Sequence, residues 1–347
     1  MTPGPGDLVV GVDSGGSGLR VALARTSADG PGPAETVVSR TPVRTGDAGI
    51  DAGHLLEQLL PMVREARDRT GPGGAGPVAA LAVGAAGMGT LGGRLRAELP
   101  AALADALGVR RLALAADAVT AYAGALGQRP GTVVAAGTGM IATGTDLTAW
   151  RRADGWGHLL GDYGGGAWVG REGLAAAFRA HDGRRGGSPA LLAAAERVFG
   201  PVTGLPGQLY PRSDRPAVLA SFAPEVARLA AEGDTVADGV LREAARHIAD
   251  AAEAVCPEES AGGAEIALTG GLFGIGDPLL VPLRGELTAR LPYARVVPPS
   301  GDPLSGALLI ASALATDSLR LPPDPTMLFL TGDGPRPATG REPAGTR

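Results

Sequence analysis

A short run of glycine, serine and aspartate near the N-terminus has the composition of a phosphate-binding turn. It reads Gly-Val-Asp-Ser-Gly-Gly-Ser-Gly over residues 11–18, after a β-branched stretch that predicts a strand at 8–12. Closely spaced glycines let backbone N–H groups approach a phosphate, and Asp13 adds a carboxylate that could serve Mg²⁺. Residues 19–24 read as a second strand, so we expect a β-hairpin rather than the strand-to-helix turn of a dinucleotide site. Taken alone, these residues would also make an ordinary glycine-rich hairpin.

The same pattern returns about 120 residues further along the chain. An apolar strand predicted at 132–136 is followed by Gly137-Thr138-Gly139, after which another strand begins. Two such turns in corresponding places could bind a polyphosphate from two sides through their backbone N–H groups. A third turn, Thr269-Gly270-Gly271, follows a predicted strand at 266–268 and offers bare backbone on which an adenine ring could lie.

Two further features carry carboxylates. Asp117 lies between a predicted strand at 111–115 and a predicted helix at 118–126, where a carboxylate can be a catalytic base or simply a helix N-cap. Residues 155–170 contain two of the three tryptophans, seven glycines and Asp162. Aromatic faces beside carboxylates suit a sugar ring, because its C–H face is apolar and its rim carries hydroxyls. The structural alternative for this segment is a tight turn at the start of a helix.

These features must be positioned by a fold in which strands and helices alternate. Both are predicted in turn over residues 8–126, and residues 168–255 are mostly helical. This alternation indicates an α/β protein, and the repeated glycine turn indicates two similar halves that face a cleft. We therefore expect a first domain at 1–118, a second domain at 119–330 with a helical insertion, and a disordered tail at 331–347.

The composition of the 347 residues excludes several classes of protein. Lysine and asparagine are both absent, which rules out P-loop and Schiff-base mechanisms. A single cysteine, Cys256, excludes an internal disulfide and a cysteine-ligated iron–sulfur cluster within one chain. A net charge of −5 and 3% aromatic residues argue against a nucleic-acid partner. The sequence shows no apolar run near the length of a membrane span and no signal peptide, so the expected location is the cytoplasm.

Together these residues resemble the actin-like ATPase superfamily, which contains sugar kinases, actin and heat-shock ATPases. Within it the chain is similar to the branch that holds N-acetylglucosamine kinase and the BadF/BadG/BcrA/BcrD ATPases, over roughly residues 7–315. The most specific segment is 155–170, because its G-W-G-H-x-x-G-D-x-G pattern is typical of that branch. The resemblance implies two actin-like (ribonuclease H-like) domains flanking a cleft for ATP and a sugar.

The resemblance also implies a role for each matching position. Asp117 would be the catalytic general base and would contact the sugar, and Asp13 would lie near Mg²⁺, directly or through water. Thr138 would lie between the sugar and ATP. The remaining positions form two sets, namely ATP or phosphate binding at Gly15, Gly16, Ser17, Gly137, Gly139, Ala230, Gly270 and Gly271, and sugar binding at Gly155, Trp156, Gly157 and Asp162.

The implied activity is ATP-dependent phosphorylation of an amino sugar, with the 6-hydroxyl of N-acetylglucosamine as the first choice. ATP and Mg²⁺ are the expected cofactors. The expected partners are the sugar, ATP and a second copy of the chain in a homodimer, with no nucleic acid and no membrane.

Several alternatives to this activity stay open. They are a BadF-type ATPase that acts on a partner protein, a sugar sensor without catalysis, and a kinase for glucosamine, N-acetylmannosamine or N-acetylmuramic acid. Two departures from the family pattern leave the exact sugar open. The asparagine that often contacts the sugar is missing, with Thr45-Gly46-Asp47 as its nearest substitute, and Ala86 stands where a serine often lies.

Overall fold

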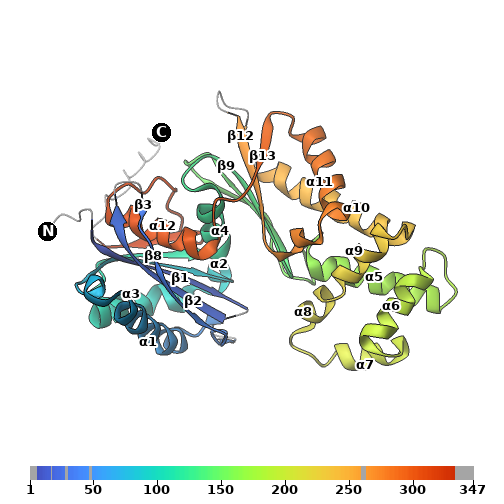
Figure 1. Ribbon diagram of the computed structural model, residues 1–347, viewed down its shortest axis with the longest axis horizontal. Coiled ribbons are helices and arrows are strands. Elements are labelled where there is room, and N and C mark those ends of the chain that lie inside the picture. The colour runs from blue at the N-terminus through green and yellow to red at the C-terminus, as the bar shows by residue number, and fades with distance from the viewer. Residues whose placement is uncertain (1–5, 17, 28–29, 47–48, 259–262, 333–347) are drawn as a thin grey trace, which may run out of the picture. The chain divides into compact units, whose positions relative to one another are not determined.

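The protein is described by a computed structural model, drawn as a ribbon in Figure 1. The structure describes residues 6–16, 18–27, 30–46, 49–258 and 263–332. The chain divides into two compact units. The first consists of the described parts of Met1–Asp117 and Ala307–Arg347, and the second consists of the described parts of Ala118–Gly306.

The first unit is built on a mixed β-sheet. Within the described residues this sheet has seven strands in the order β14-β8-β7-β1-β2-β3, with β4 paired to β2. Helices α1 and α3 lie on one face and α12 on the other (Figure 1). The strands are β1 (Leu8–Gly15), β2 (Gly18–Ser27), β3 (Gly30–Pro31), β4 (Glu35–Ser39), β7 (Val78–Ala85), β8 (Arg111–Ala116) and β14 (Leu328–Thr331), with β5 (Thr45–Gly46) and β6 (Gly49–Ile50) as a separate pair. The helices are α1 (Ala52–Thr70), η1 (Gly71–Gly74), α2 (Met88–Leu91), α3 (Gly93–Leu107) and α12 (Pro303–Ala315).

The second unit joins a smaller sheet to a group of helices. The described part of this sheet has the order β11-β10-β9-β12-β13. Its strands are β9 (Gly131–Ala136), β10 (Met140–Thr145), β11 (Trp150–Asp154), β12 (Ala264–Thr269) and β13 (Ala294–Val297). Its helices are α4 (Asp117–Leu126), α5 (Gly166–His181), α6 (Pro189–Phe199), η2 (Val202–Gly204), α7 (Leu205–Leu209), α8 (Arg215–Ala220), α9 (Ala223–Ala231), α10 (Thr235–Val255), η3 (Gly271–Ile275) and α11 (Asp277–Arg290).

The same strand topology occurs in both units. β1 pairs antiparallel with β2 and parallel with β7. In the second unit β9 pairs antiparallel with β10 and parallel with β12. Each glycine turn therefore closes a hairpin whose first strand lies inside its sheet. The predicted α/β class is confirmed, and the first glycine turn is a hairpin as the sequence predicted.

The C-terminal part of the second predicted domain belongs to the first unit. Residues from Ala307 onward pack there, whereas the sequence analysis assigned residues up to 330 to the second domain. The physical reason is β14, which completes the first sheet by pairing antiparallel with β8. Thr331, the first residue of the predicted tail, ends β14, and residues 333–347 lie outside the described residues.

Helix α10 shows how the second unit forms its core. The Asp234 carboxylate caps its N-terminus by accepting hydrogen bonds from the N–H groups of Val236 and Ala237. Leu241 and Ile248 lie on one side of the helix and are fully buried. This apolar stripe packs α10 against β10 and β11, the strands that precede the segment 155–170.

Within the described part of the chain, no helix combines the length and apolarity needed to cross a bilayer.

Candidate functional site

Three parallel strands of the first unit end at one edge of its sheet. β7 lies between β1 and β8, so Asp13, Gly84 and Ala115 lie in one row across the three strands. Asp117 follows β8 directly and begins α4. Asp13 and Ala115 are therefore about two strand spacings apart, roughly 10 Å, and Asp117 follows Ala115 by two residues. The carboxyl edge of parallel strands is where α/β proteins bind ligands, and the structure places both predicted carboxylates there.

The Asp13 carboxylate is held by a neighbouring cation. Arg20 of β2 donates from Nη2 and Nε to Asp13 Oδ2, at 2.7 and 3.0 Å. Mg²⁺ usually keeps several waters and takes one or two carboxylates beside the phosphates of a nucleotide. Among the described residues there is no group of three or more metal-ligating side chains. A single carboxylate, that of Asp13, is compatible with this kind of Mg²⁺ binding. Because Arg20 already offsets the charge of the Asp13 carboxylate, this carboxylate is better suited to contact Mg²⁺ through a water molecule than to coordinate it directly.

Four glycines of the predicted ATP-binding set are required neither by packing nor by backbone conformation. A Cβ on Gly15, Gly16, Gly137 or Gly271 would have no heavy atom within 4 Å, and none of these residues has a left-handed φ. Gly18, in contrast, has a φ of +135°, and a Cβ there would overlap Ser39 O. Packing therefore explains Gly18 but not the other four. The four unexplained glycines all belong to the predicted ATP-binding set, where close approach of a phosphate or a base needs bare backbone.

The second glycine turn is tied to the start of helix α5. The N–H groups of Gly166 and Ala167 donate to the carbonyl oxygens of Gly137 and Thr138, both at 2.8 Å. A Cβ on Gly165 would come within 2.7 Å of the Gly139 carbonyl carbon. The backbone of the turn is thus fixed by contact with α5, while Thr138 is exposed at its tip. The structure brings this predicted phosphate loop and the end of the predicted sugar segment together.

Asp162 connects the same two predicted sets. Its Oδ1 accepts a hydrogen bond from Gly157 N at 3.0 Å. A Cβ on Gly139 would overlap its Oδ2, so the carboxylate lies directly against the phosphate loop. A half-buried carboxylate that retains acceptor capacity is suited to bind a sugar hydroxyl. Gly139, Gly157 and Asp162 are therefore neighbours within the second unit.

Burial raises the pKa of the Asp162 carboxyl above its ordinary 3.8, and the nearby Asp154 carboxylate raises it further. The Gly157 N–H, His158 and Arg152 lower the pKa, but by less. In the pH range between the unfolded and the raised folded pKa, the native state binds more protons than the unfolded state. Stability contributed by this group therefore falls as pH rises through that range.

We expect Asp162→Asn to have a higher melting temperature than the wild type at pH 7. The gap should narrow as the pH falls, because a growing fraction of the wild-type carboxyl is then neutral as well. Thermal unfolding of both proteins from pH 4 to pH 8 measures this difference. A lower melting temperature for the variant at pH 7, or a gap that does not change with pH, would contradict the pKa argument.

The Trp156 side chain lines a hollow that the Asp162 carboxylate does not line. The indole is 62% exposed, and the Arg152 guanidinium carbon lies 4.2 Å from the centre of its ring. The ring lines a hollow of about 420 Å³ together with Tyr163 and His247, and Asp162 does not line it. The predicted sugar residues thus form two groups, one around Asp162 and one around the Trp156 ring.

The remaining predicted residues lie at the strand edge of the second unit, in its helical core, or outside the described residues. Thr269 pairs with Ala135 of β9, so Gly270 and Gly271 reach the edge where the turn 137–139 lies. A Cβ on Gly270 would overlap Ala136 O. Ala230 is half-buried in α9 against the apolar core of the second unit, where its methyl group contributes to packing. Ser17 and Asp47 lie outside the described residues.

Reading the sequence did not identify Asp154 as a candidate site residue. Its carboxylate accepts hydrogen bonds from the N–H groups of Asp162 and Tyr163, at 2.5 and 2.9 Å. The only available signal was an Asp-Gly pair at the end of a strand, which is also typical of any turn. Ala86, the residue at a position where the family often has serine, donates its N–H to Ser14 O at 3.0 Å and therefore lies at the predicted edge.

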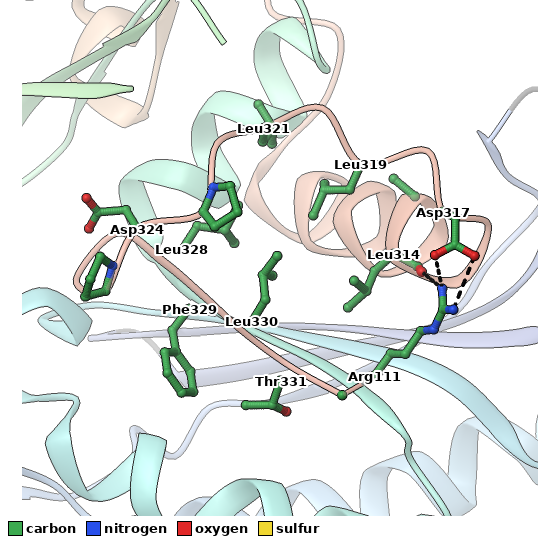
Figure 2. A pocket seen from close by; sticks show the side chains of 14 residues that line it. Arg111, Leu314, Asp317, Leu319, Leu321, Asp324, Leu328, Phe329, Leu330 and Thr331 are labelled. Carbon is green, nitrogen blue, oxygen red and sulfur yellow. Dashed lines mark hydrogen bonds and ion pairs between the residues drawn. The ribbon is translucent and has the colours of Figure 1, made fainter. Parts of the chain in front are cut away.

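A larger cavity in the first unit contains none of the predicted residues. It has a volume of about 550 Å³ and lies between α12, the segment 317–325 and β14. Figure 2 shows Leu319, Leu321, Leu328 and Leu330 around it. Its one guanidinium, that of Arg111, is paired with Asp317 at 2.7 Å and also bonds Leu314 O. The rest of the lining is mostly apolar, and its Asp324 carboxylate already accepts the N–H groups of Thr326 and Met327, so this cavity is a poor basis for phosphoryl transfer.

Comparison with known proteins gives relatives for most of the chain. It is 29% identical over 201 residues to the N-acetylmuramic acid/N-acetylglucosamine kinase of Clostridium acetobutylicum, a match that covers 56% of this chain and 65% of that one. The chain thus spans just under two thirds of the length of this curated relative.

Two crystal structures extend the comparison. The first is a structural-genomics target from Chromobacterium violaceum described as a candidate N-acetylglucosamine kinase. It is 29% identical with a TM-score of 0.67, and the match covers 88% of this chain and 99% of that one. The second is a ROK family glucokinase from Streptomyces griseus in complex with glucose and AMPPNP, at 19% identity and a TM-score of 0.52. That match covers 88% of this chain and 99% of the glucokinase, and shows a shared fold.

A family comparison covers both units. The BadF/BadG/BcrA/BcrD ATPase family matches residues 10–311, a range that includes every predicted site residue. This confirms the resemblance inferred from the glycine turns and from residues 155–170. The chain belongs to the BadF/BadG/BcrA/BcrD ATPase family.

Proposed function

We propose that the chain is an ATP-dependent sugar kinase that transfers a phosphoryl group to an amino sugar, with the 6-hydroxyl of N-acetylglucosamine as the first choice. Membership of an ATPase family supports the use of ATP. The Clostridium acetobutylicum relative is named as a kinase for N-acetylmuramic acid and N-acetylglucosamine, which supports an amino sugar as acceptor.

The observation that carries this proposal is the position of Asp117. It lies one residue beyond the row formed by Ser14, Ala85 and Ala116, at the edge to which the first glycine hairpin belongs. A general base must be positioned within hydrogen-bond reach of the proton that it removes, and a strongly shifted pKa is not required. Asp117 is suited to accept the proton of the sugar hydroxyl as that oxygen attacks the γ-phosphorus of ATP.

The other residues bind and orient the two substrates. In the first unit the bare backbone at Gly15 and Gly16 is suited to approach a phosphate. In the second unit Thr138 and Gly139 are the candidates to donate N–H groups to a phosphate, because the Gly137 N–H already donates to Gly139 O at 2.9 Å. In the second unit Asp162 offers its carboxylate to a sugar hydroxyl. When Mg²⁺ accompanies ATP, it neutralises charge on the phosphates, and Asp13 is the residue we assign to hold it through water.

A partner-driven ATPase is the main alternative within this family. The iron–sulfur version of that activity needs thiolate ligands at a surface, and the chain has a single cysteine. Cys256 is only 4% exposed, and burial raises the pKa of its thiol. One buried cysteine in each chain falls short of the four thiolates that hold a typical iron–sulfur cluster, even if two copies shared it, which favours the sugar kinase.

The test is ADP release from Mg-ATP with and without a panel of amino and neutral sugars. We expect release to rise only with N-acetylglucosamine or a close relative, and phosphorus NMR of the product then shows which hydroxyl is modified. Steady hydrolysis that is indifferent to every sugar would favour the partner-driven ATPase. If no ADP forms with any sugar in the panel, the kinase proposal fails for those acceptors.

A further inference from the structure

Two aspartates in the predicted sugar segment adopt a backbone conformation that side chains rarely take. Asp154, the last residue of β11, has a φ of 61°, and Asp162 has a φ of 57°. Aspartate tolerates this left-handed region better than most residues, but the conformation persists only when the surroundings hold it. The two residues bracket the turn 155–161, which contains Trp156 and Gly157.

The Asp154 carboxylate closes this turn. Its Oδ1 accepts the N–H of Asp162 at 2.5 Å, and its Oδ2 accepts the N–H of Tyr163 at 2.9 Å. Both oxygens of one carboxylate thus bind two consecutive backbone groups, eight and nine residues further along the chain. A Cβ on Gly161 would overlap Asp154 Oδ1, so the chain passes directly over the carboxylate.

Asp162 lies between this turn and the phosphate loop, which the N–H groups of Gly166 and Ala167 hold independently. With its N–H fixed by Asp154, its side chain accepts the N–H of Gly157 and lies against Gly139. Arg152 holds the start of the same turn by donating to the carbonyl oxygens of Asp154 and Gly155, at 3.1 and 2.6 Å. Arg152 therefore bonds the backbone carbonyl of Asp154, while the carboxylate of Asp154 accepts the N–H groups of Asp162 and Tyr163.

We propose that Asp154 is a positioning residue that holds Asp162 in place for the sugar by clamping two consecutive N–H groups at the end of the turn 155–161. The proposal rests on the proposed function for the identity of the ligand. The clamp itself does not, because it is defined by hydrogen bonds within one unit.

Three variants separate the carboxylate from the backbone conformation. Asp154→Gly removes the carboxylate and adopts a φ of 61° without strain, so any loss reports the missing hydrogen bonds. Asp154→Asn tolerates the same φ and keeps one acceptor oxygen. The control is Asp146→Asn, in the turn at the opposite end of β11, where the carboxylate also accepts backbone N–H groups, those of Thr148 and Ala149.

The first readout is sugar-dependent kinase activity. We expect Asp154→Gly to raise KM for the sugar by about tenfold to 100-fold, because two charge-assisted hydrogen bonds are lost. KM for ATP and kcat should change by less than about threefold, since the lost interaction orients the sugar before the transition state. Asp154→Asn should lie between Asp154→Gly and the wild type, and Asp146→Asn should match the wild type.

The second readout is independent of activity. Hydrogen–deuterium exchange resolved at the amides of Asp162 and Tyr163 should be at least about tenfold faster in Asp154→Gly than in the wild type. The same amides should be unchanged in Asp146→Asn. Unchanged exchange in Asp154→Gly would overturn the clamp, whatever the activity.

The two readouts distinguish failure of this inference from failure of the proposed function. Faster exchange with an unchanged sugar KM would show a clamp without a positioning role and would overturn the inference. If the wild type phosphorylates no sugar, the proposed function fails and the role toward the sugar fails with it. The exchange experiment then still decides whether Asp154 clamps the turn.

Discussion

Asp117→Asn should lower kcat for sugar phosphorylation by about 10²–10⁴-fold, the usual contribution of a general base. The amide that replaces the carboxylate is nearly the same size, but it cannot accept the hydroxyl proton. Asp117 begins α4, and asparagine is also accepted at the start of a helix, so the fold should tolerate the change. Sugar affinity, measured by calorimetry without ATP, should stay within about threefold because the neutral side chain still offers hydrogen bonds.

A matched control for this variant is Asp105→Asn. Asp105 is exposed on α3 in the same unit, away from the carboxyl edge of the sheet. It should keep wild-type kcat and KM. If Asp117→Asn kept near-normal turnover, the general base would be misassigned, and the observation that carries the proposed function would be lost.

Gly165→Ala should have the second large effect, on stability and activity together. Gly165 has a φ of −69°, which alanine adopts freely, so the change tests space alone. The added Cβ would come within 2.7 Å of the Gly139 carbonyl carbon and 3.0 Å of Asp162 O. Both neighbours are backbone atoms, and such overpacking costs about 1–3 kcal/mol of the free energy of unfolding. Displacing the phosphate loop by even ~1 Å should lower kcat/KM by about 100-fold.

Urea unfolding and steady-state kinetics measure the two parts of this prediction. Gly239→Ala is the control, because Gly239 lies in helix α10 with no atom within 4 Å of an added Cβ. Alanine favours a helix interior over glycine by about 1 kcal/mol, so the control should be neutral or more stable. Wild-type kcat/KM in Gly165→Ala would mean that the turn 137–139 does not need its present position for catalysis.

The parts of the fold that the sequence could predict are local. A β-branched run followed by glycines and a second β-branched run predicts a hairpin, and both the 15–18 and the 137–139 turns are hairpins. Asp117 could be placed at a strand-to-helix junction because it follows the short apolar run 111–116, precedes an alanine-rich stretch and is a residue type favoured at helix starts. These features depend on neighbours within a few residues, which is why reading along the chain finds them.

Long-range contacts account for what was missed. Pairing of β14 with β8 joins residues more than 200 positions apart, and no local pattern in 328–331 indicates that partner. The bonds from Asp154 to Asp162 and Tyr163 depend on how a turn of several residues closes, which composition does not determine. The roles of individual site residues, including Ser17 and Ala230, and the homodimer stay predictions.

Strand β14 also sets the order in which this protein can form on the ribosome. β8 emerges roughly 200 residues before the strand that covers its outer edge, and the whole second unit, a continuous segment, is synthesised in between. During that interval the nascent chain presents an unpaired edge whose side chains, Leu112 to Ala115, are buried in the finished protein. Translation that stalls before β14 would therefore leave a polypeptide prone to edge-to-edge association. Completing the synthesis of β14 removes this exposed edge and with it one route to aggregation.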